Sequence, residues 1–155
     1  MLGRDAASQS FAVAEQLMPP CWRRFEVLLP SHPHQGKCLV LVVEDEALVR
    51  LDAADTVRDA GFDVIEAADA DDAIRILESR NDICVVFSDI DLPGSMDGLK
   101  LAAAVSRRWP PVRLILTSGH VRVTPAELPE GGRFFAKPYR NDDIARCIRE
   151  MIPTA

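Results

Sequence analysis

Beyond residue 37, short runs of apolar residues alternate with longer stretches in which apolar positions recur every three or four residues. The short runs predict strands, and the longer stretches predict amphipathic helices. The predicted strands are residues 38–43, 62–66, 83–88, 112–116 and 133–136. The predicted helices are residues 46–60, 70–80, 97–108 and 141–151. This alternation favours an α/β fold, with a parallel sheet and helices on both of its faces.

Residues with known preferences at helix ends mark the limits of three of these helices. Gly61 is expected to stop the first helix, Asp97 to cap the third and Asn141 to cap the last. The inward face of the first helix is expected to include Leu48, Leu51, Ala54 and Val57. The end signals therefore agree with the helices that the spacing of apolar residues predicts.

Segment 121–131 interrupts the alternation before the last predicted strand. Pro125, Pro129 and a following pair of glycines leave room for one or two helical turns. Thr124 is expected to cap these turns, with Pro125 in the first of them. Right-handed crossovers place the carboxyl ends of the five strands on one edge of the sheet. We expect a flavodoxin-like, doubly wound, five-stranded parallel sheet in the order 2-1-3-4-5. Its fourth helix is expected to be short or irregular.

Residues 1–36 precede the alternating unit and follow a different pattern. A weak helical spacing brings four apolar residues to one face, and several prolines then break it; the four are Phe11, Ala14, Leu17 and Met18. We therefore expect an N-terminal extension over residues 1–36, weakly helical or partly disordered, followed by one domain over residues 37–155.

The net charge of −6 belongs to the alternating unit, because residues 1–36 carry three basic and three acidic side chains. An acidic domain without a basic stripe argues against direct binding to nucleic acid, whose affinity for proteins comes largely from Lys and Arg. Divalent cations and basic protein surfaces are the partners that this charge favours.

The four cysteines form no CxxC pair, which favours reduced thiols in a cytoplasmic protein. The sequence contains no apolar stretch approaching the ~20 residues that a membrane-spanning helix needs. We therefore expect neither a membrane span nor secretion.

Charged residues follow three of the predicted strands directly. Asp89 follows residues 83–88, Glu44 and Asp45 follow the first strand, and Lys137 follows the last. The carboxyl ends of parallel strands lie along one edge of a sheet. In the predicted order the first and third strands are neighbours, so Glu44 and Asp45 are expected to face Asp89.

Three carboxylates in one crevice repel one another unless a cation lies among them, and oxygen ligands with retained waters are what Mg²⁺ prefers. Lys137 could balance the remaining charge or contact a phosphoryl oxygen, and Thr117 adds a hydroxyl at the end of the fourth strand. Such a set suits phosphoryl transfer to a carboxylate. Each residue taken singly also fits an ordinary role in a helix start, a turn or a solvated surface, but their convergence on one edge favours a site.

Four motifs occur in a fixed order: residues 41–46 (LVVEDE), residues 89–98 (DIDLPGSMDG), Thr117 and Lys137-Pro138. Together, over about residues 38–152, they resemble the response-regulator receiver domain of two-component systems, in the CheY-like superfamily and of the single-domain type. The resemblance implies a cytoplasmic phosphoprotein that works in phosphorelay signal transduction.

The resemblance implies that Asp89 is the phosphoacceptor. It also implies that Asp45, Asp89 and the backbone carbonyl of Asp91 bind Mg²⁺ directly, while Glu44 acts in the same pocket through water. The phosphoryl group is expected to come from a histidine kinase or a phosphotransfer protein.

The resemblance further implies that Lys137 and Thr117 contact the phosphoryl group, with Thr117 as the switch hydroxyl and Phe134 as the switch aromatic. One residue is inserted between Pro93 and Met96, which should enlarge the loop after the third strand. The proline-broken segment 121–131 replaces the regular fourth helix of the family, so the family's usual partners cannot be carried over to this face.

These inferences predict a stand-alone phosphoacceptor without a recognisable output domain, a signalling protein rather than an enzyme. Its partners would be a kinase or phosphotransfer protein and a downstream protein, without nucleic acid or membrane; a homodimer is left open. One alternative is a phosphatase of the haloacid-dehalogenase type, which the pair Asp89 and Asp91 resembles. Another is a degenerate receiver that binds partners without being phosphorylated.

Overall fold

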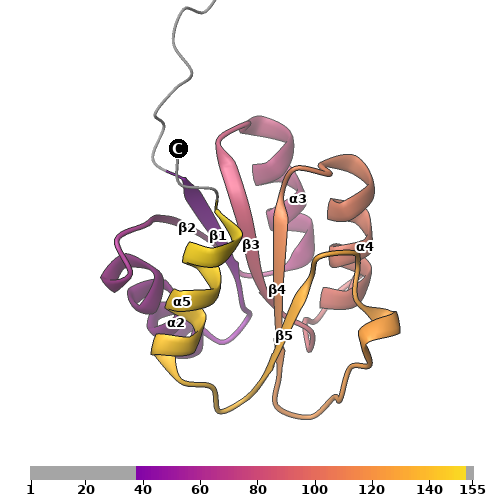
Figure 1. Ribbon diagram of the computed structural model, residues 1–155. Helices are drawn as coiled ribbons and strands as arrows, with labels where there is room; N and C mark the ends of the chain where they lie inside the picture. The colour runs from indigo at the N-terminus through magenta and orange to yellow at the C-terminus, as the bar shows by residue number, and fades with distance from the viewer. Residues whose placement is uncertain (1–37, 153–155) are drawn as a thin grey trace, which may run out of the picture. The chain divides into compact units, whose positions relative to one another are not determined.

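The computed structural model describes residues 38–152, which form a five-stranded parallel sheet with helices on both faces (Figure 1). The strands are β1 (Leu39–Val43), β2 (Asp63–Ala67), β3 (Ile83–Asp89), β4 (Arg113–Ser118) and β5 (Arg133–Ala136). The helices within the described residues are α2 (Ala47–Asp59), α3 (Ala70–Ser79), α4 (Gly98–Arg108) and α5 (Asn141–Met151). The extension predicted over residues 1–36 lies outside the described residues, so the division of the chain near residue 37 stays a prediction.

The strands lie in the order β2-β1-β3-β4-β5, and all neighbouring pairs are parallel. This is the predicted order, and it confirms the doubly wound, flavodoxin-like fold. The order reverses between β1 and β3, which pair directly from Leu39 and Ile83 to Val43 and Ser88. A crevice between the connections leaving two such strands is where open α/β sheets usually bind their ligands.

Each face of the sheet has its own apolar core. Helices α3 and α4 cover one face, and α2 and α5 cover the other (Figure 1). Successive residues of β1 alternate between the two: Leu41 and Val43 belong to the α3 and α4 side, while Val40 and Val42 belong to the α2 and α5 side. Both sides of β1 are therefore buried, which explains why the strand appears in the sequence as a continuous apolar run.

The inward face predicted for α2 is partly wrong. Leu48 and Leu51 are 76% and 49% exposed, whereas Ala53, Ala54, Thr56 and Val57 are buried. At 3.6 residues per turn, the two leucines lie on the other side of the helix from Val57. The face toward the sheet and α5 is made of small and β-branched side chains, so the size of the apolar residues misled the prediction.

Helix ends agree with the sequence at two positions and differ at a third. Gly61, with φ +93°, ends α2, and the Asp97 side chain caps α4 by accepting a hydrogen bond of 2.8 Å from the amide of Lys100. Asn141, however, is the first residue of α5 and not its cap. The carbonyl of Arg140 already accepts hydrogen bonds from the amides of Asp143 and Ile144, at 3.0 and 3.3 Å, so Arg140 is the cap, while the helix covers the predicted residues 141–151.

The connection from β4 to β5 contains a single 3₁₀ turn, Pro125–Glu127, where the sequence predicts one or two helical turns (Figure 1). Thr124 is its N-cap residue, and the Glu127 side chain reaches back to it, since Oε2 accepts from the amide and the hydroxyl of Thr124 at 2.8 Å. Prolines lack the amide that a longer helix would need. The expectation of a short, irregular fourth helix is confirmed.

None of the helices among residues 38–152 combines the length and the apolar character that crossing a bilayer requires.

Candidate functional site at the carboxyl edge of the sheet

Three carboxylates meet where the chain leaves β1 and β3. Asp89 is the last residue of β3, and Glu44 and Asp45 directly follow β1. One carboxylate oxygen from each lies within 4.8 Å of the others. Glu44 and Asp89 are buried, at 5% and 7% exposed, while Asp45 is exposed. The structure thus brings together the three acidic residues that the strand order predicts, with Asp45 at the open side of the pocket.

Lys137 lies between the two buried carboxylates. Its Nζ donates to Oε2 of Glu44 at 2.9 Å and to Oδ2 of Asp89 at 3.2 Å. Lys137 follows β5 directly, and its amide donates to the carbonyl of Ser118 at 2.9 Å, which anchors its backbone at the end of β4. The side chain therefore supplies the opposite charge without which two buried carboxylates would be costly.

Backbone amides hold the second oxygen of each buried carboxylate. Oε1 of Glu44 accepts from the amide of Glu46 at 3.2 Å, and Oδ1 of Asp89 accepts from the amide of Asp91 at 3.3 Å. Glu44 and Asp89 are thus bound in the same way, with one oxygen on an amide two residues ahead and the other on Lys137. The pocket is ordered by its own residues.

The burial of the pocket affects the pKa values of Glu44 and Lys137. Loss of solvent raises the pKa of Glu44 above its usual value, and the negative charge of Asp89 acts in the same direction, against the effect of Lys137. Burial also opposes the charged form of Lys137, but its hydrogen bond to Glu44 and the charge of Asp89 outweigh that, so the pKa of Lys137 is raised. The pKa of Glu44 therefore lies above that of an ordinary glutamate.

The remaining predicted residues lie on β4 and β5. Thr117 pairs in register with Asp89 and is 2% exposed. Phe134 pairs with Leu116 and packs, half-buried, against the core on the α3 and α4 side. Val123, from the irregular connection, packs against the same core. The geometry brings Thr117 beside Asp89 and sets Phe134 on the side of the sheet that also carries the irregular connection.

Sequence reasoning missed Arg50, which supports the acidic turn from α2. Its Nη1 donates to the carbonyl of Glu44 at 2.7 Å and to that of Asp45 at 3.4 Å, and its Nε lies 3.6 Å from Oε2 of Glu66. An arginine one helical turn after an acidic pair was the available signal. The pattern of side chains along the helix does not indicate a bond to backbone carbonyls of the preceding turn.

Gly98 ends the motif of residues 89–98, and the pocket depends on its lack of a side chain. A Cβ there would overlap the carbonyl oxygen of Asp89 and lie 2.6 Å from Cα of Ile90. The amide of Gly98 donates to the carbonyl of Ile90 at 2.9 Å. Helix α4 can therefore start directly against the backbone that presents Asp89.

The donor set of the pocket fits a hard divalent cation. All three side chains offer carboxylate oxygens, and Asp45 is exposed, so waters could complete a shell of the kind that Mg²⁺ keeps. No soft ligand is among the three. Lys137 already neutralises part of their charge, so one added cation can balance the rest.

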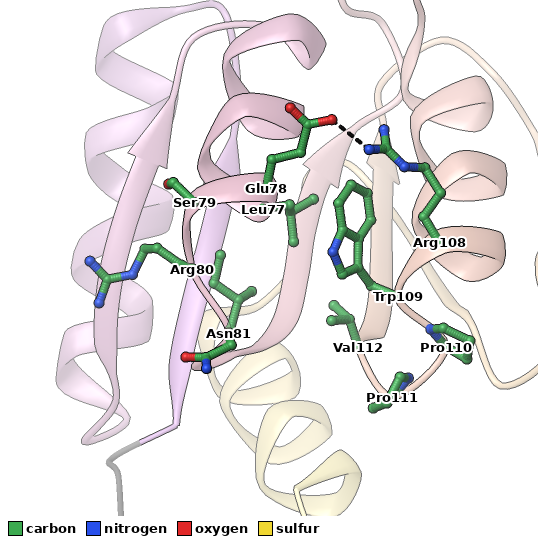
Figure 2. A pocket seen from close by; sticks show the side chains of 11 residues that line it. Leu77, Glu78, Ser79, Arg80, Asn81, Arg108, Trp109, Pro110, Pro111 and Val112 are labelled. Atoms are coloured by element: carbon green, nitrogen blue, oxygen red, sulfur yellow. Dashed lines mark hydrogen bonds and ion pairs between the residues drawn. The ribbon is translucent and has the colours of Figure 1, made fainter.

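A wider groove lies elsewhere, at the amino ends of β3 and β4. Figure 2 shows this groove of about 620 Å³, between the end of α3 and the turn that joins α4 to β4. The Arg108 guanidinium lies 4.3 Å from the centre of the Trp109 ring and pairs with Glu78. Two arginines line the groove, Arg80 and Arg108, and both pair with acidic side chains, so the groove offers no unbalanced positive charge. The chemistry, rather than the volume, identifies the site.

Comparison with known proteins agrees with this geometry. The family model described as "Response regulator receiver domain" matches residues 40–149. Sensor kinase CckA of Brucella abortus is 32% identical over 123 residues, which cover 76% of this chain and 13% of that protein. Nitrogen assimilation regulatory protein NtrX of Azorhizobium caulinodans is 33% identical over 119 residues, covering 74% and 26%. The chain spans between 13% and 26% of the length of these curated relatives.

Among solved structures, the receiver domain of NtrX from Brucella abortus superimposes with a TM-score of 0.67 at 30% identity, covering 75% of this chain and 99% of that one. The sheet order, the pocket and these matches together define an α/β signalling domain of the phosphoacceptor class. The chain belongs to the response-regulator receiver domain family of two-component systems. The comparisons give no support to the phosphatase of the haloacid-dehalogenase type.

Proposed function

We propose that Asp89 is the phosphoacceptor of this receiver domain. Its carboxylate oxygen would attack the phosphorus of a phosphohistidine, forming an acyl phosphate as the bond between phosphorus and the imidazole nitrogen breaks. The observation that carries the proposal is the hydrogen bond from Lys137 to Asp89, because it orients a buried carboxylate with a cation beside the oxygen that would react. An Asp serving only as a helix cap would not need this lysine.

Mg²⁺ would be held by Asp45, Asp89 and the backbone carbonyl of Asp91, with Glu44 acting through water. When bound, the ion neutralises charge on the transferred phosphoryl group. The chain's own contribution is positional: the amides of Glu46 and Asp91 fix the two buried carboxylates, and Lys137 is within reach of a phosphoryl oxygen on Asp89.

Thr117 would then act as the switch hydroxyl and Phe134 as the switch aromatic. Thr117 is the register partner of Asp89, which supports a contact between its hydroxyl and a phosphoryl oxygen. Phe134 shares its core with Val123 and Leu128 of the irregular connection, so a change in its rotamer would be felt there. As a phenylalanine it can rotate but has no hydroxyl to donate.

The donor of the phosphoryl group would be a histidine kinase or a phosphotransfer protein, and the reader of the switched state a downstream protein. The acidic charge of the domain supports protein partners over nucleic acid. We infer a cytoplasmic signalling role in which residues 37–155 form the receiver and residues 1–36 an extension, without substrate turnover beyond gain and loss of the phosphoryl group.

Intact-mass measurement after incubation with acetyl phosphate tests the assignment. Wild type should gain the mass of one phosphoryl group in the presence of Mg²⁺ and little with EDTA, while Asp89→Asn should gain none. Equal labelling of wild type and Asp89→Asn would refute it. Repeated hydrolysis of a phosphoester that Asp91→Asn abolishes would support the phosphatase, and binding of the downstream partner that ignores phosphorylation would support the degenerate receiver.

A further inference from the structure

Ser118, the last residue of β4, makes three hydrogen bonds through one buried hydroxyl. Its Oγ donates to Oδ2 of Asp91 at 2.9 Å and accepts from the amides of His120 at 3.1 Å and Val121 at 2.8 Å. The residue is 2% exposed. A serine hydroxyl has one proton and two lone pairs, so this set uses its full capacity.

These contacts form a continuous path away from the phosphoacceptor. The amide of Asp91 binds Oδ1 of Asp89 at 3.3 Å, the carboxylate of Asp91 binds Ser118, and Ser118 binds the first amides of the connection to β5. The carbonyl of Ser118 also accepts from the amide of Lys137 at 2.9 Å. One residue thus joins the loop after β3, the connection after β4 and the end of β5.

An ordinary turn explains only part of this arrangement. A serine that ends a strand often accepts from amides two and three residues ahead, as Ser118 does from His120 and Val121. It does not require a bond to a carboxylate 27 residues away in another loop. That bond fixes the direction of the hydroxyl proton, and therefore leaves both lone pairs for the two amides.

The connection after β4 has little else of its own to order it. Its only helical turn is the three residues Pro125–Glu127, and the bonds to Ser118 hold its first residues. In a connection built as a regular helix, repeated backbone hydrogen bonds would do this work. Here the hydroxyl of Ser118 holds the amides of His120 and Val121, while further along Val123 packs against the core and Thr124 bonds to Glu127.

We propose that Ser118 is a positioning residue that couples the acidic pocket to residues 119–124, with the Asp91 carboxylate as the link. The proposal rests on the assignment of Asp89 as phosphoacceptor. The loop of Asp91 adjusts when the pocket is loaded, the bond to Ser118 changes with it, and the amides of His120 and Val121 change their hydrogen bonding. This route is separate from the movement of Thr117.

Amide hydrogen exchange at His120 and Val121 tests the coupling, with Mg²⁺ plus acetyl phosphate as the probe. In wild type, exchange at both amides should change when the probe is added. Ser118→Ala should exchange about tenfold faster without the probe, the effect of one lost hydrogen bond, and should lose the response. Asp91→Ala keeps the hydroxyl but should also lose the response, and because Asp91 is exposed this variant does not disturb the core.

Two controls separate coupling from general loosening. Asp91→Asn keeps an oxygen that can accept from Ser118 and should keep the response. Ser95 lies in the same loop as Asp91 but away from Ser118, and it bonds to the Asp71 carboxylate at 3.0 and 3.1 Å. Ser95→Ala removes these bonds and should respond like wild type. By linkage, Ser118→Ala should also alter the affinity for Mg²⁺, measured by calorimetry.

Either of two results would overturn the coupling: a wild-type response in Asp91→Ala, or an unchanged response in Ser118→Ala. Intact mass measured on the same samples distinguishes the two levels of the proposal. If wild type gains no phosphoryl group, the assignment of Asp89 fails. If wild type is phosphorylated while Asp91→Ala still responds, only the role of Ser118 fails.

Discussion

Lys137 and Asp89 are joined by a hydrogen bond of 3.2 Å between Nζ and Oδ2, although 48 residues separate them in the chain. The same ammonium group binds Glu44 at 2.9 Å. Its two bonds span the order reversal, because Glu44 follows β1, whereas Asp89 ends β3 and Lys137 follows β5. The stability of the domain and the chemistry of the pocket are therefore linked through one side chain.

Replacing Lys137 should destabilise the domain. In Lys137→Ala two buried carboxylates lose their shared cation, and we expect a loss of about 2 to 4 kcal/mol in the free energy of unfolding at neutral pH. Urea unfolding measures this loss. Lys100→Ala, which removes an exposed lysine of α4, is the control and should change stability little. Equal stability of Lys137→Ala and wild type would show that the ammonium group is not needed to balance the pocket.

Magnesium should stabilise the folded domain. A ligand present at ten times its dissociation constant adds about 1.4 kcal/mol, so the melting temperature should rise with Mg²⁺ and saturate. Asp45→Asn should lower the affinity, because Asp45 is the carboxylate on the open side of the pocket. Asp59→Asn, an exposed acid at the end of α2, is the matched control. A rise of the same size in Asp45→Asn would place the ion elsewhere.

The affinity for Mg²⁺ should fall on mild acidification. The raised pKa of Glu44 means that its protonation favours the folded state: this contribution is complete below the ordinary pKa of a glutamate and is lost as the pH rises through the raised value. Near neutral pH the charged carboxylate therefore costs stability, which a cation offsets. Calorimetry between the ordinary pKa of a glutamate and the raised pKa of Glu44 should show that protons are released when Mg²⁺ binds. Glu44→Gln should bind Mg²⁺ more weakly, and its affinity should depend less on pH. A wild-type affinity that stays constant across the window would contradict this account.

Arg50→Ala should weaken Mg²⁺ binding without unfolding the domain. Arg50 holds the carbonyls of Glu44 and Asp45, and loss of such a supporting contact typically lowers metal affinity about tenfold. Arg58→Ala is the control, since Arg58 also pairs with Glu66, at 3.0 Å, but its recorded partners do not include the acidic turn. If both variants bind Mg²⁺ equally well, Arg50 contributes only to the surface of the domain.

Gly98→Ala should be strongly destabilising, whereas Gly119→Ala should be tolerated. A methyl group at position 98 meets the backbone of Asp89 and Ile90, which cannot yield without moving Asp89, so a cost of about 2 kcal/mol or more is expected. At position 119 the nearest atom is Cβ of Lys137, at the ordinary contact distance of 3.9 Å. Thermal unfolding of the two variants compares the sites directly. A stable Gly98→Ala would mean that α4 can retreat from the pocket.

The order of the strands and the meeting of Glu44, Asp45 and Asp89 could be predicted from the sequence. Parallel strands put their carboxyl ends on one edge, so residues that follow apolar runs converge wherever the chain order allows. The alternation of short and long patterns indicated a parallel sheet, and the flavodoxin-like order then made the first and third strands neighbours. It needed no knowledge of side-chain contacts.

The contacts that order the pocket could not be predicted in this way. Arg50 binds carbonyls, and Ser118 binds a carboxylate from another loop; both depend on the path of the backbone through turns, where sequence patterns carry little information. The exposed Leu48 shows a related limit, because the inward face of α2 is chosen by which side chains fit between the sheet and α5 and not by which are most apolar.

The prolines after β4 also limit the distance over which a structural change in the pocket can extend. A long helix moves as a rigid body and carries a displacement over its whole length, but a turn of three residues, Pro125–Glu127, is too short to do so. A shift that starts at Ser118 therefore fades within a few residues, near the 39% exposed Val121. A partner that reads this domain should sense a small patch beside the pocket, with a short range and a correspondingly small structural difference between its two states.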